Sequence, residues 1–321
     1  MNPSTTAADT DPFVHPALFY RGRDDYLTGT VPFIRQGLDN GEPVAVSVPG
    51  ANLELLRTAL GDDAERVRLL DMTEEGRNPG RIIPGVLRAF ADSHPGQRVR
   101  IIGEPIWAER SELEYPACAQ HEALINLAFT GREVTILCPY DVTRLDARAL
   151  TDAEATHPLL IDSTGERASP GYDPGRIING YNTPLPAPSP TEPAAHTTLD
   201  AVTGDAASLA RARAMARGQA QRAGLTGDRV DDVELVVAEL VANSVDHGGG
   251  QGRLSIWPEG GLLVCEVRDT GHLTDPLAGR RPASPGQLRG RGLLLINHLA
   301  DLVRLHTGPQ GTTVRACFAT A

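Results

Sequence analysis

The sequence predicts a two-domain protein in which an α/β domain with a mostly parallel sheet precedes an α+β domain. The length of 321 residues exceeds the roughly 100–200 residues of one ordinary domain. Residues 183–198, TPLPAPSPTEPAAHTT, are crowded with proline and small polar residues, which favour an extended linker. The order of apolar and amphipathic segments also changes across this linker. We therefore place the two domains at residues 12–182 and 199–321.

Before the linker, short β-branched segments alternate with amphipathic ones. The predicted strands lie at 44–48, 67–72, 98–104 and 133–141. The predicted helices lie near 51–60, 81–91 and 116–129. This alternation is typical of a mostly parallel sheet that is covered by helices on both faces.

After the linker, two helices come first. One is rich in alanine and arginine near 205–223, and the other contains ELVVAELVANSVDHGGG at 234–250. The elements that follow are strands near 253–257 and 262–268, a Gly/Pro-rich stretch, a helix near 291–303 and a strand at 312–318. Paired strands followed by a helix and a strand predict an α+β sandwich with an antiparallel or mixed sheet.

The composition narrows the class of protein. With 40% apolar and 22% charged residues, and no apolar run of about 20 residues, the chain resembles a soluble globular protein without a membrane helix. The N-terminus lacks the basic start and apolar core of a secretory signal, so we expect a cytoplasmic protein. A net charge of −11 disfavours nucleic acid as a direct partner. All 30 basic residues are arginine, which excludes a Walker A phosphate loop and lysine Schiff-base chemistry.

The chain has four cysteines, Cys118, Cys138, Cys265 and Cys317, and no two of them form a CxxC pair. This spacing argues against a zinc site or a disulfide framework. We therefore expect buried free thiols.

A row of polar residues lies on the helix around 234–250. Because four residues advance a helix by about 400°, Glu239, Asn243 and His247 form one ridge. That ridge borders the apolar stripe of Val233, Val237, Leu240 and Val241. The ordinary interpretation of this ridge is a solvent-exposed helix flank that ends in a glycine C-cap. The neighbouring motifs decide whether the ridge also has a catalytic or binding role.

The strand LLVCEVR runs into DTG, Asp269 to Gly271. A carboxylate at a strand end can accept a hydrogen bond from the exocyclic amine of adenine. A glycine two residues later lets the base approach the backbone. Taken alone, DxG is an ordinary strand-to-loop turn.

Glycines stand directly before the apolar helix in GQLRGRGLLLI, residues 286–296. Free N–H groups at a helix start form an anion site suited to phosphates. Arg289 and Arg291 add positive charge. In isolation, a plain loop explains this stretch equally well.

The ordered set of E-x-x-x-N, DxG, GxGL and a last strand starting with GTT resembles the Bergerat-type (GHKL) ATPase fold, over roughly residues 200–321. Gyrase, histidine kinases and anti-sigma-factor kinases share this fold. The resemblance implies that Asn243 is a ligand of Mg²⁺ bound with ATP and that Glu239 is the general base. Asp269 and Gly271 would hold adenine. The remaining nucleotide-binding residues implied are His247, Arg289, Gly290, Arg291, Gly292, Leu293 and Thr312 or Thr313, with 272–289 as the ATP lid.

Among Bergerat proteins, the preceding helix and compact length resemble the anti-sigma-factor serine/threonine kinases of the RsbW type. Such kinases bind a sigma factor and phosphorylate an antagonist of the STAS class. Two alternatives stay open: a non-catalytic protein in which ATP gates binding, and an unorthodox histidine kinase. His196 and His121 are poor phosphoacceptor candidates, because one lies among prolines and the other lacks the usual proline. A homodimer is compatible with the resemblance, but the pattern does not establish one.

The first domain resembles the MEDS sensory domain of the DcmR type, on HPALFY, GEPVAVSV, IIGEPIW, EYPACAQHEALIN and TILCPYD. The resemblance implies a RecA-like sheet without a phosphate loop and a small-molecule ligand. Strand ends deliver ligands in α/β sheets. We therefore expect a ligand or redox site formed by His15, Glu104, Cys138 and Asp141, although capping and core packing would also explain these residues.

Overall fold

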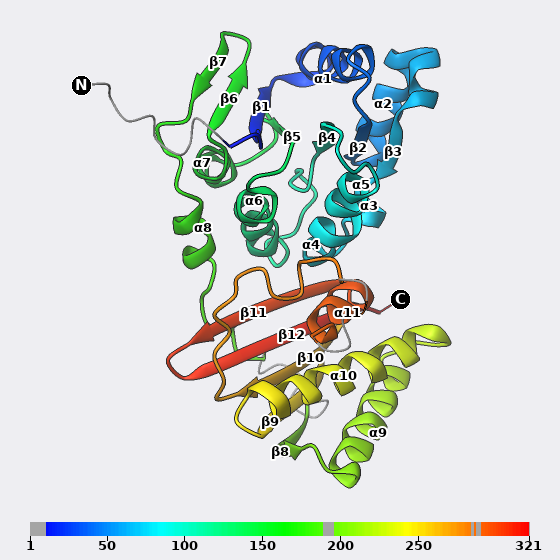
Figure 1. Ribbon diagram of the computed structural model, residues 1–321. Coiled ribbons are helices and arrows are strands. Elements are labelled where there is room, and N and C mark those ends of the chain that lie inside the picture. The colour runs from blue at the N-terminus through cyan, green and yellow to red at the C-terminus, as the bar shows by residue number, and fades with distance from the viewer. Residues whose placement is uncertain (1–10, 189–195, 284–285, 287–289, 321) are drawn as a thin grey trace, which may run out of the picture. The chain divides into compact units, whose positions relative to one another are not determined.

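A computed structural model describes residues 11–188, 196–283, 286 and 290–320. The chain divides into two compact units, Met1–Tyr181 and Asn182–Ala321, each with its own sheet (Figure 1). Among the described residues, no helix combines the length and the apolar character needed to cross a membrane.

The first unit contains a seven-stranded sheet. Its strands, in spatial order, are β3 (Arg68–Asp71), β2 (Val44–Val48), β4 (Val99–Gly103), β5 (Val134–Asp141), β1 (Pro16–Tyr20), β6 (Leu159–Asp162) and β7 (Gly165–Ala168). All neighbours run parallel except β6 and β7, which confirms the predicted mostly parallel sheet. Strand β1, which lies between β5 and β6, is absent from the predicted strands. Its first residue is a proline, which a buried strand tolerates at that position.

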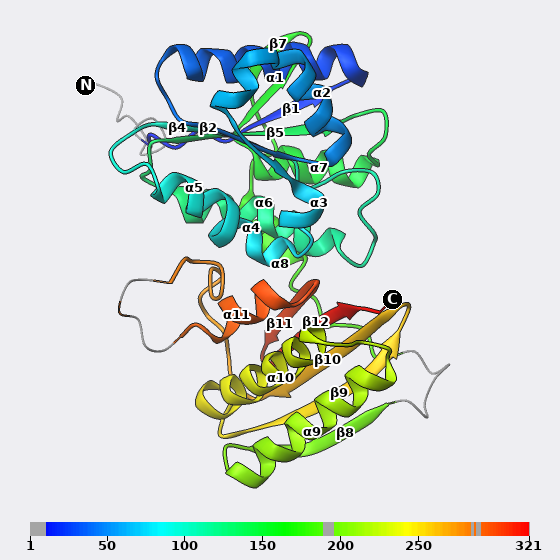
Figure 2. The same ribbon diagram turned by 90° about the vertical axis from the view of Figure 1, so that its right-hand side faces the viewer.

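Helices lie on both faces of this sheet, with α1 and α2 on one side and α5 and α6 on the other (Figure 2). The helices are α1 (Gly22–Asp39), α2 (Gly50–Leu60), α3 (Met72–Glu75), α4 (Pro79–Ile82), α5 (Arg88–Asp92), α6 (Tyr115–Phe129), α7 (Ala147–Thr156) and α8 (Pro174–Gly180). A 3₁₀ helix spans Gly61–Arg66, and a π-helical turn spans Ile83–Leu87. Pro84 lies in that π turn, because proline cannot donate the helical hydrogen bond.

The second unit has a five-stranded antiparallel sheet. Its strands, in spatial order, are β11 (Leu302–Gly308), β12 (Gly311–Ala319), β10 (Leu262–Asp269), β9 (Gln251–Glu259) and β8 (Thr197–Thr203). Helices α9 (Ala206–Arg222) and α10 (Asp228–His247) pack against it, and α11 (Gly292–Leu299) contacts α10 and β11. The predicted apolar stripe of α10 is fully buried in this core.

Two predicted segments of this unit are wrong. The predicted helix at 291–303 ends at Leu299, and its last residues begin β11. The break occurs at Asp301, whose carboxylate accepts the Ala319 N–H at 2.8 Å and so starts the pairing of β11 with β12. The predicted linker at 183–198 ends too late, because β8 already begins at Thr197. Its residues 189–195 lie outside the described part of the chain.

The start of the predicted linker and Asn182, the residue before it, are also attached to the second sheet. Asn182 donates from Nδ2 to the Thr307 carbonyl at 2.9 Å and accepts the Thr307 N–H at 3.0 Å. The Pro186 carbonyl accepts a hydrogen bond from the buried Arg315 at 2.7 Å. This part of the chain is therefore fixed to the second unit before its first strand begins.

Candidate functional site

A cavity of about 400 Å³ opens in the second unit where the end of α10, the end of β10 and the start of α11 meet. Most of the predicted nucleotide-site residues line it, namely Asn243, His247, Asp269, Gly271, Gly290, Gly292, Leu293 and Thr312. The residues come from segments up to about 70 positions apart along the chain, so the fold, and not local sequence, assembles the site.

Asp269 is held from two sides at the end of β10. Its Oδ1 accepts the Gly271 N–H at 2.9 Å, and its Oδ2 accepts the Ser244 hydroxyl at 2.6 Å. A carboxylate oxygen can accept more than one hydrogen bond, so both oxygens keep capacity for an amine in the cavity. The Ser244 contact is absent from the sequence prediction, although a buried serine next to Asn243 in mid-helix was the available signal.

The turn after β10 packs closely against the end of α10, and only glycine fits at two positions. A Cβ on Gly271 would lie 2.2 Å from the His247 carbonyl oxygen. A Cβ on Gly248 would lie 2.3 Å from the Asp269 Cγ. These approaches fix the DxG turn beside the helix end, while the His247 side chain itself is exposed at the cavity.

Glu239 and Asn243 meet at the first residue of α11. A Cβ on Gly292 would lie 2.8 Å from Asn243 Oδ1 and 2.9 Å from Glu239 Oε2. The Asn243 Nδ2 is buried and has no hydrogen-bond partner among the described residues. The first N–H groups of a helix also have no partner within it. An unpaired amide, a carboxylate and a helix start therefore converge on one point, and this donor set fits a magnesium-bound phosphate.

The last strand contributes one of its two threonines to the cavity. The Thr312 hydroxyl donates to the Gly271 carbonyl at 2.8 Å and lies 3.0 Å from the Thr307 hydroxyl. Thr313 follows on the other face of the strand, opposite Arg268 and His306, and is not among the residues that line the cavity. The structure thus favours Thr312, and the sequence prediction omits Thr307, whose strand it assigns partly to a helix.

The glycine-rich start of α11 is partly described. Gly290 has a φ of +79°, a left-handed conformation that favours glycine, and it lines the cavity. Arg291 occupies the N-cap position and is not a lining residue. Arg289 lies outside the described residues. The cavity instead has Arg281, which pairs with Asp275 within the predicted lid.

A second cavity, of about 550 Å³, lies at the carboxyl ends of β1, β4 and β5 in the first unit. Glu104 and Asp141 line it. Both Glu104 oxygens accept from Asn52 Nδ2, at 3.0 and 2.9 Å, and burial raises the pKa of Glu104 to about 8. The Tyr26 hydroxyl is buried beside this cavity, and burial and then the neighbouring Glu104 raise its pKa. Asn52 and Tyr26 are missing from the sequence prediction, since each is unremarkable in its own helix.

The predicted sensory residues do not form one site. His15 and Cys138 are absent from this cavity and lie together in the interior, where His15 Nε2 is 3.5 Å from Cys138 Sγ. Asp141 is engaged at the strand end, because its Oδ1 accepts the Thr143 N–H and hydroxyl at 2.9 and 2.6 Å. The expected single site is therefore corrected to two separate places in the first unit.

Comparisons with known families agree with this division. Residues 14–158 match the methanogen/methylotroph DcmR sensory (MEDS) domain, and residues 202–318 match the histidine kinase-like ATPase domain. A similar curated protein is the serine-protein kinase RsbW of Halalkalibacterium halodurans, 34% identical over 100 residues. The match covers 27% of this chain and spans 62% of the length of that relative.

Two solved structures are distantly similar. One contains the RsbU and RsbW domains of a Mycobacterium tuberculosis protein, with 19% identity, a TM-score of 0.30, and coverage of 41% of this chain and 33% of that chain. The other is the SiaB–SiaC complex of Pseudomonas aeruginosa, with 15% identity, a TM-score of 0.31, and coverage of 38% and 88%. These similarities are too distant to carry an argument about function. By its family matches, the chain combines a MEDS domain with a histidine kinase-like ATPase domain.

Proposed function

We propose that this chain is an ATP-dependent serine/threonine protein kinase that regulates a sigma factor through a STAS-class antagonist, under the control of a ligand bound to its MEDS domain. The observation that carries the proposal is the convergence of Glu239 and Asn243 on Gly292, beside the cavity that contains Asp269. The name of the RsbW relative supports the choice of a serine kinase within the ATPase family.

Each residue has a distinct role in this proposal. Asn243 offers its amide oxygen to Mg²⁺, which, when bound, offsets the negative charge of the phosphates. Glu239 accepts the proton of the partner's hydroxyl group as that oxygen attacks. Asp269 accepts a hydrogen bond from the adenine amine and disfavours guanine, which presents an oxygen there. The start of α11 binds phosphate oxygens through its free N–H groups.

The test is phosphoryl transfer from labelled ATP, with Mg²⁺, to a STAS-domain protein from the same organism. Glu239→Gln should lower transfer at least about 100-fold, because it removes the base, while nucleotide binding persists. Glu234→Gln is the matched control, since Glu234 lies on the same helix but pairs with Arg217 at the surface. Equal loss in both variants would contradict the role of Glu239.

The same assay separates the alternatives. Nucleotide binding without transfer would favour a non-catalytic protein in which ATP gates partner binding. Acid-labile phosphate on the chain itself would favour a histidine kinase. His121 does not suit that role, because its side chain is only 1% exposed in α6.

For the MEDS domain we propose a small polar ligand in the cavity beside Glu104. Glu104 with a pKa of about 8 is protonated at neutral pH, so it can donate as well as accept a hydrogen bond. The buried Tyr26 hydroxyl supplies a further polar contact. A screen of small alcohols, amines and carboxylates by thermal shift should find ligands whose effect is lost in Tyr26→Phe. If every effect survives that change, the ligand does not bind in this cavity.

A further inference from the structure

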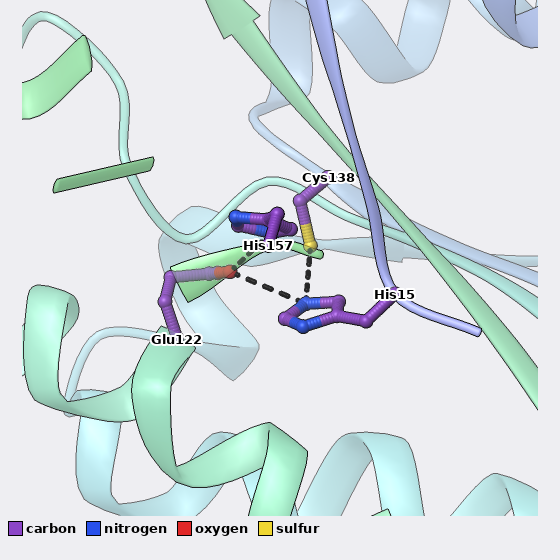
Figure 3. A group of neighbouring side chains, drawn as sticks. All are labelled: His15, Glu122, Cys138 and His157. Carbon is purple, nitrogen blue, oxygen red and sulfur yellow. Dashed lines mark hydrogen bonds and ion pairs between the residues drawn. The ribbon is translucent and has the colours of Figure 1, made fainter. Parts of the chain in front are cut away.

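Four side chains that are distant in the sequence meet in the interior of the first unit. His15 precedes β1, Glu122 lies on α6, Cys138 lies on β5 and His157 follows α7. Their side chains point toward one another (Figure 3), and one ligand atom from each lies within 4.8 Å of the others. All four are at most 1% exposed. Such a group of imidazoles, a thiol and a carboxylate demands an explanation, because burying polar groups without partners is costly.

The outer contacts of both histidines fix which ring nitrogen carries the proton. Asn126 donates from Nδ2 to the Thr156 carbonyl at 2.8 Å, so its Oδ1 faces His15 Nδ1 at 3.2 Å. His157 Nδ1 lies 2.9 Å from the Ala153 carbonyl oxygen. Both partners are acceptors, so each Nδ1 donates. In the neutral rings, each Nε2 therefore directs a lone pair into the cluster.

These lone pairs face another acceptor. His157 Nε2 lies 3.0 Å from Glu122 Oε2, and His15 Nε2 lies 3.5 Å from the same oxygen. Among the described residues, no hydrogen-bond partner with acceptable geometry faces either oxygen of Glu122 or the Nε2 of His157. The Cys138 thiol can donate to His15 Nε2, but His157 Nε2 and Glu122 Oε2 still face each other as two acceptors at 3.0 Å, which is repulsive unless a cation lies between them.

We propose that His15, Glu122, Cys138 and His157 form a binding site for a divalent transition metal of the zinc class. Zinc binds imidazole nitrogen, carboxylate oxygen and thiolate sulfur at about 2.0–2.3 Å, which implies roughly 3.3–3.6 Å between ligand atoms of a tetrahedron. The contacts of 3.0 and 3.5 Å to Glu122 and of 3.5 Å between His15 and Cys138 are close to these edges. Histidines oriented through Nδ1 by outer acceptors are typical of metal ligands.

The charges of this site balance once a metal is bound. Because its Nδ1 donates to Asn126 Oδ1, the neutral His15 ring presents the lone pair of Nε2 for ligation. Cys138 keeps its proton while no metal is present, because burial and Glu122 raise its pKa. On binding, the thiol releases this proton to solvent, and the two anionic ligands neutralise the divalent ion.

The experiment uses the full chain, freed of metal with a chelator, incubated with Zn²⁺ and passed through a desalting column. The wild type should retain one zinc per chain by elemental analysis. Cys138→Ser and His157→Gln should lower retention at least about tenfold. Cys265→Ser is the matched control, because Cys265 is a buried thiol in the other unit, and it should retain zinc like the wild type. A wild type without zinc, or variants that retain it fully, would overturn the proposal.

A second measurement covers the case in which a variant fails to fold. Co²⁺ added to the metal-free wild type should give the absorption of thiolate-to-cobalt charge transfer, because Cys138 is the thiol in the proposed ligand set, and Cys265→Ser should keep this band. Titration of the metal into the metal-free chain, in two buffers that differ in their heat of ionisation, should show the release of about one proton per metal bound. A cobalt complex of the wild type without the thiolate band would exclude Cys138 as a ligand and overturn the site as proposed.

Discussion

At the scale of single residues, the proposal assigns to Asp269 the choice of the base that the cavity binds. One of its oxygens is held by the Gly271 N–H and the other by the Ser244 hydroxyl. Because this frame fixes the carboxylate, Asp269→Asn should keep the shape but replace one acceptor by a donor. We expect a loss of roughly 1.5–3 kcal/mol in ATP binding and the loss of preference over GTP.

Competition between ATP and GTP for a fluorescent nucleotide measures this effect. Asp246→Asn changes an exposed aspartate on α10; it is the control and should bind like the wild type. A wild type with equal affinity for both nucleotides would contradict the assignment of Asp269 to adenine.

Glu104 makes the stability of the first unit depend on pH. Its folded pKa of about 8 lies above the ordinary value of 4.5, so between these values the folded state keeps a proton that the unfolded state releases. The free energy of unfolding therefore falls as pH rises through this window, by up to about 1.4 kcal/mol per pH unit, and levels off above it. Glu104→Gln should remove this dependence.

The measurement is urea unfolding from pH 5 to pH 9, followed by the fluorescence of Trp107 in a Trp257→Phe background. Trp107 lines the same cavity as Glu104, and the chain has 2 tryptophans, so the remaining signal reports the first unit. If the free energy of unfolding depends on pH in the same way with Glu104 and with Glu104→Gln, Glu104 titrates normally in the fold, contrary to this prediction.

At the scale of elements, the start of α11 packs against α10 at the edge of the cavity. Gly292→Ala would place a Cβ within 3.0 Å of both Asn243 and Glu239, so one of the elements must shift. We expect nucleotide affinity to fall at least about tenfold, which corresponds to about 1.4 kcal/mol. Gly218→Ala on α9 meets only the flexible Arg222 side chain at 3.4 Å and should leave affinity unchanged.

Equilibrium dialysis with ATP and Mg²⁺ compares the two glycine variants. Similar affinity in Gly292→Ala and in the wild type would mean that nucleotide binding does not depend on the close approach of Gly292 to Asn243 and Glu239. Both variants should unfold cooperatively, so that a loss of binding is separable from a loss of structure.

The elements show what sequence patterns can and cannot predict. Strands β2, β4 and β5 and helices α6 and α9 follow their predicted ranges, because each has a clear apolar period. Helix α10 is also found, but it begins at Asp228, six residues before the predicted segment. Strand β11 does not, since LADLVRLH continues the apolar run of α11 and only pairing with β12 makes it a strand. Strand β8 is an edge strand with a bulge between Leu199 and Val202, and its polar sequence resembles the linker before it.

At the scale of the whole molecule, the sequence motifs predicted most of the residues that line the cavity of the second unit, but they did not predict the interior cluster of the first unit. The ATPase motifs stand in one order along the chain, so their residues could be found one by one. Glu122 and His157 have no such signal: one is a helix residue and the other follows a helix, and only the parallel sheet brings them to His15 and Cys138. Four cysteines without a CxxC pair therefore argue less strongly against a metal site than their spacing suggests.

The proposed partners are also a property of the whole chain. Purification of the tagged full-length protein from its native cell should recover a STAS-domain protein and a sigma factor, identified by mass spectrometry. The proportion of each partner should change when ATP is depleted, because nucleotide binding is proposed to determine which partner the chain binds. Recovery of neither class would contradict the regulatory function while leaving the ATP site untested by this result.

Calorimetric titration of ATP into the full chain, with Mg²⁺ and with a chelator, is the most direct test of the nucleotide site. The convergence of Glu239, Asn243 and Gly292 predicts one ATP per chain, bound more tightly with Mg²⁺. Asn243→Ala should remove most of the magnesium dependence, because it deletes the metal ligand. The absence of nucleotide uptake by the wild type, or a magnesium dependence that Asn243→Ala leaves intact, would contradict the account.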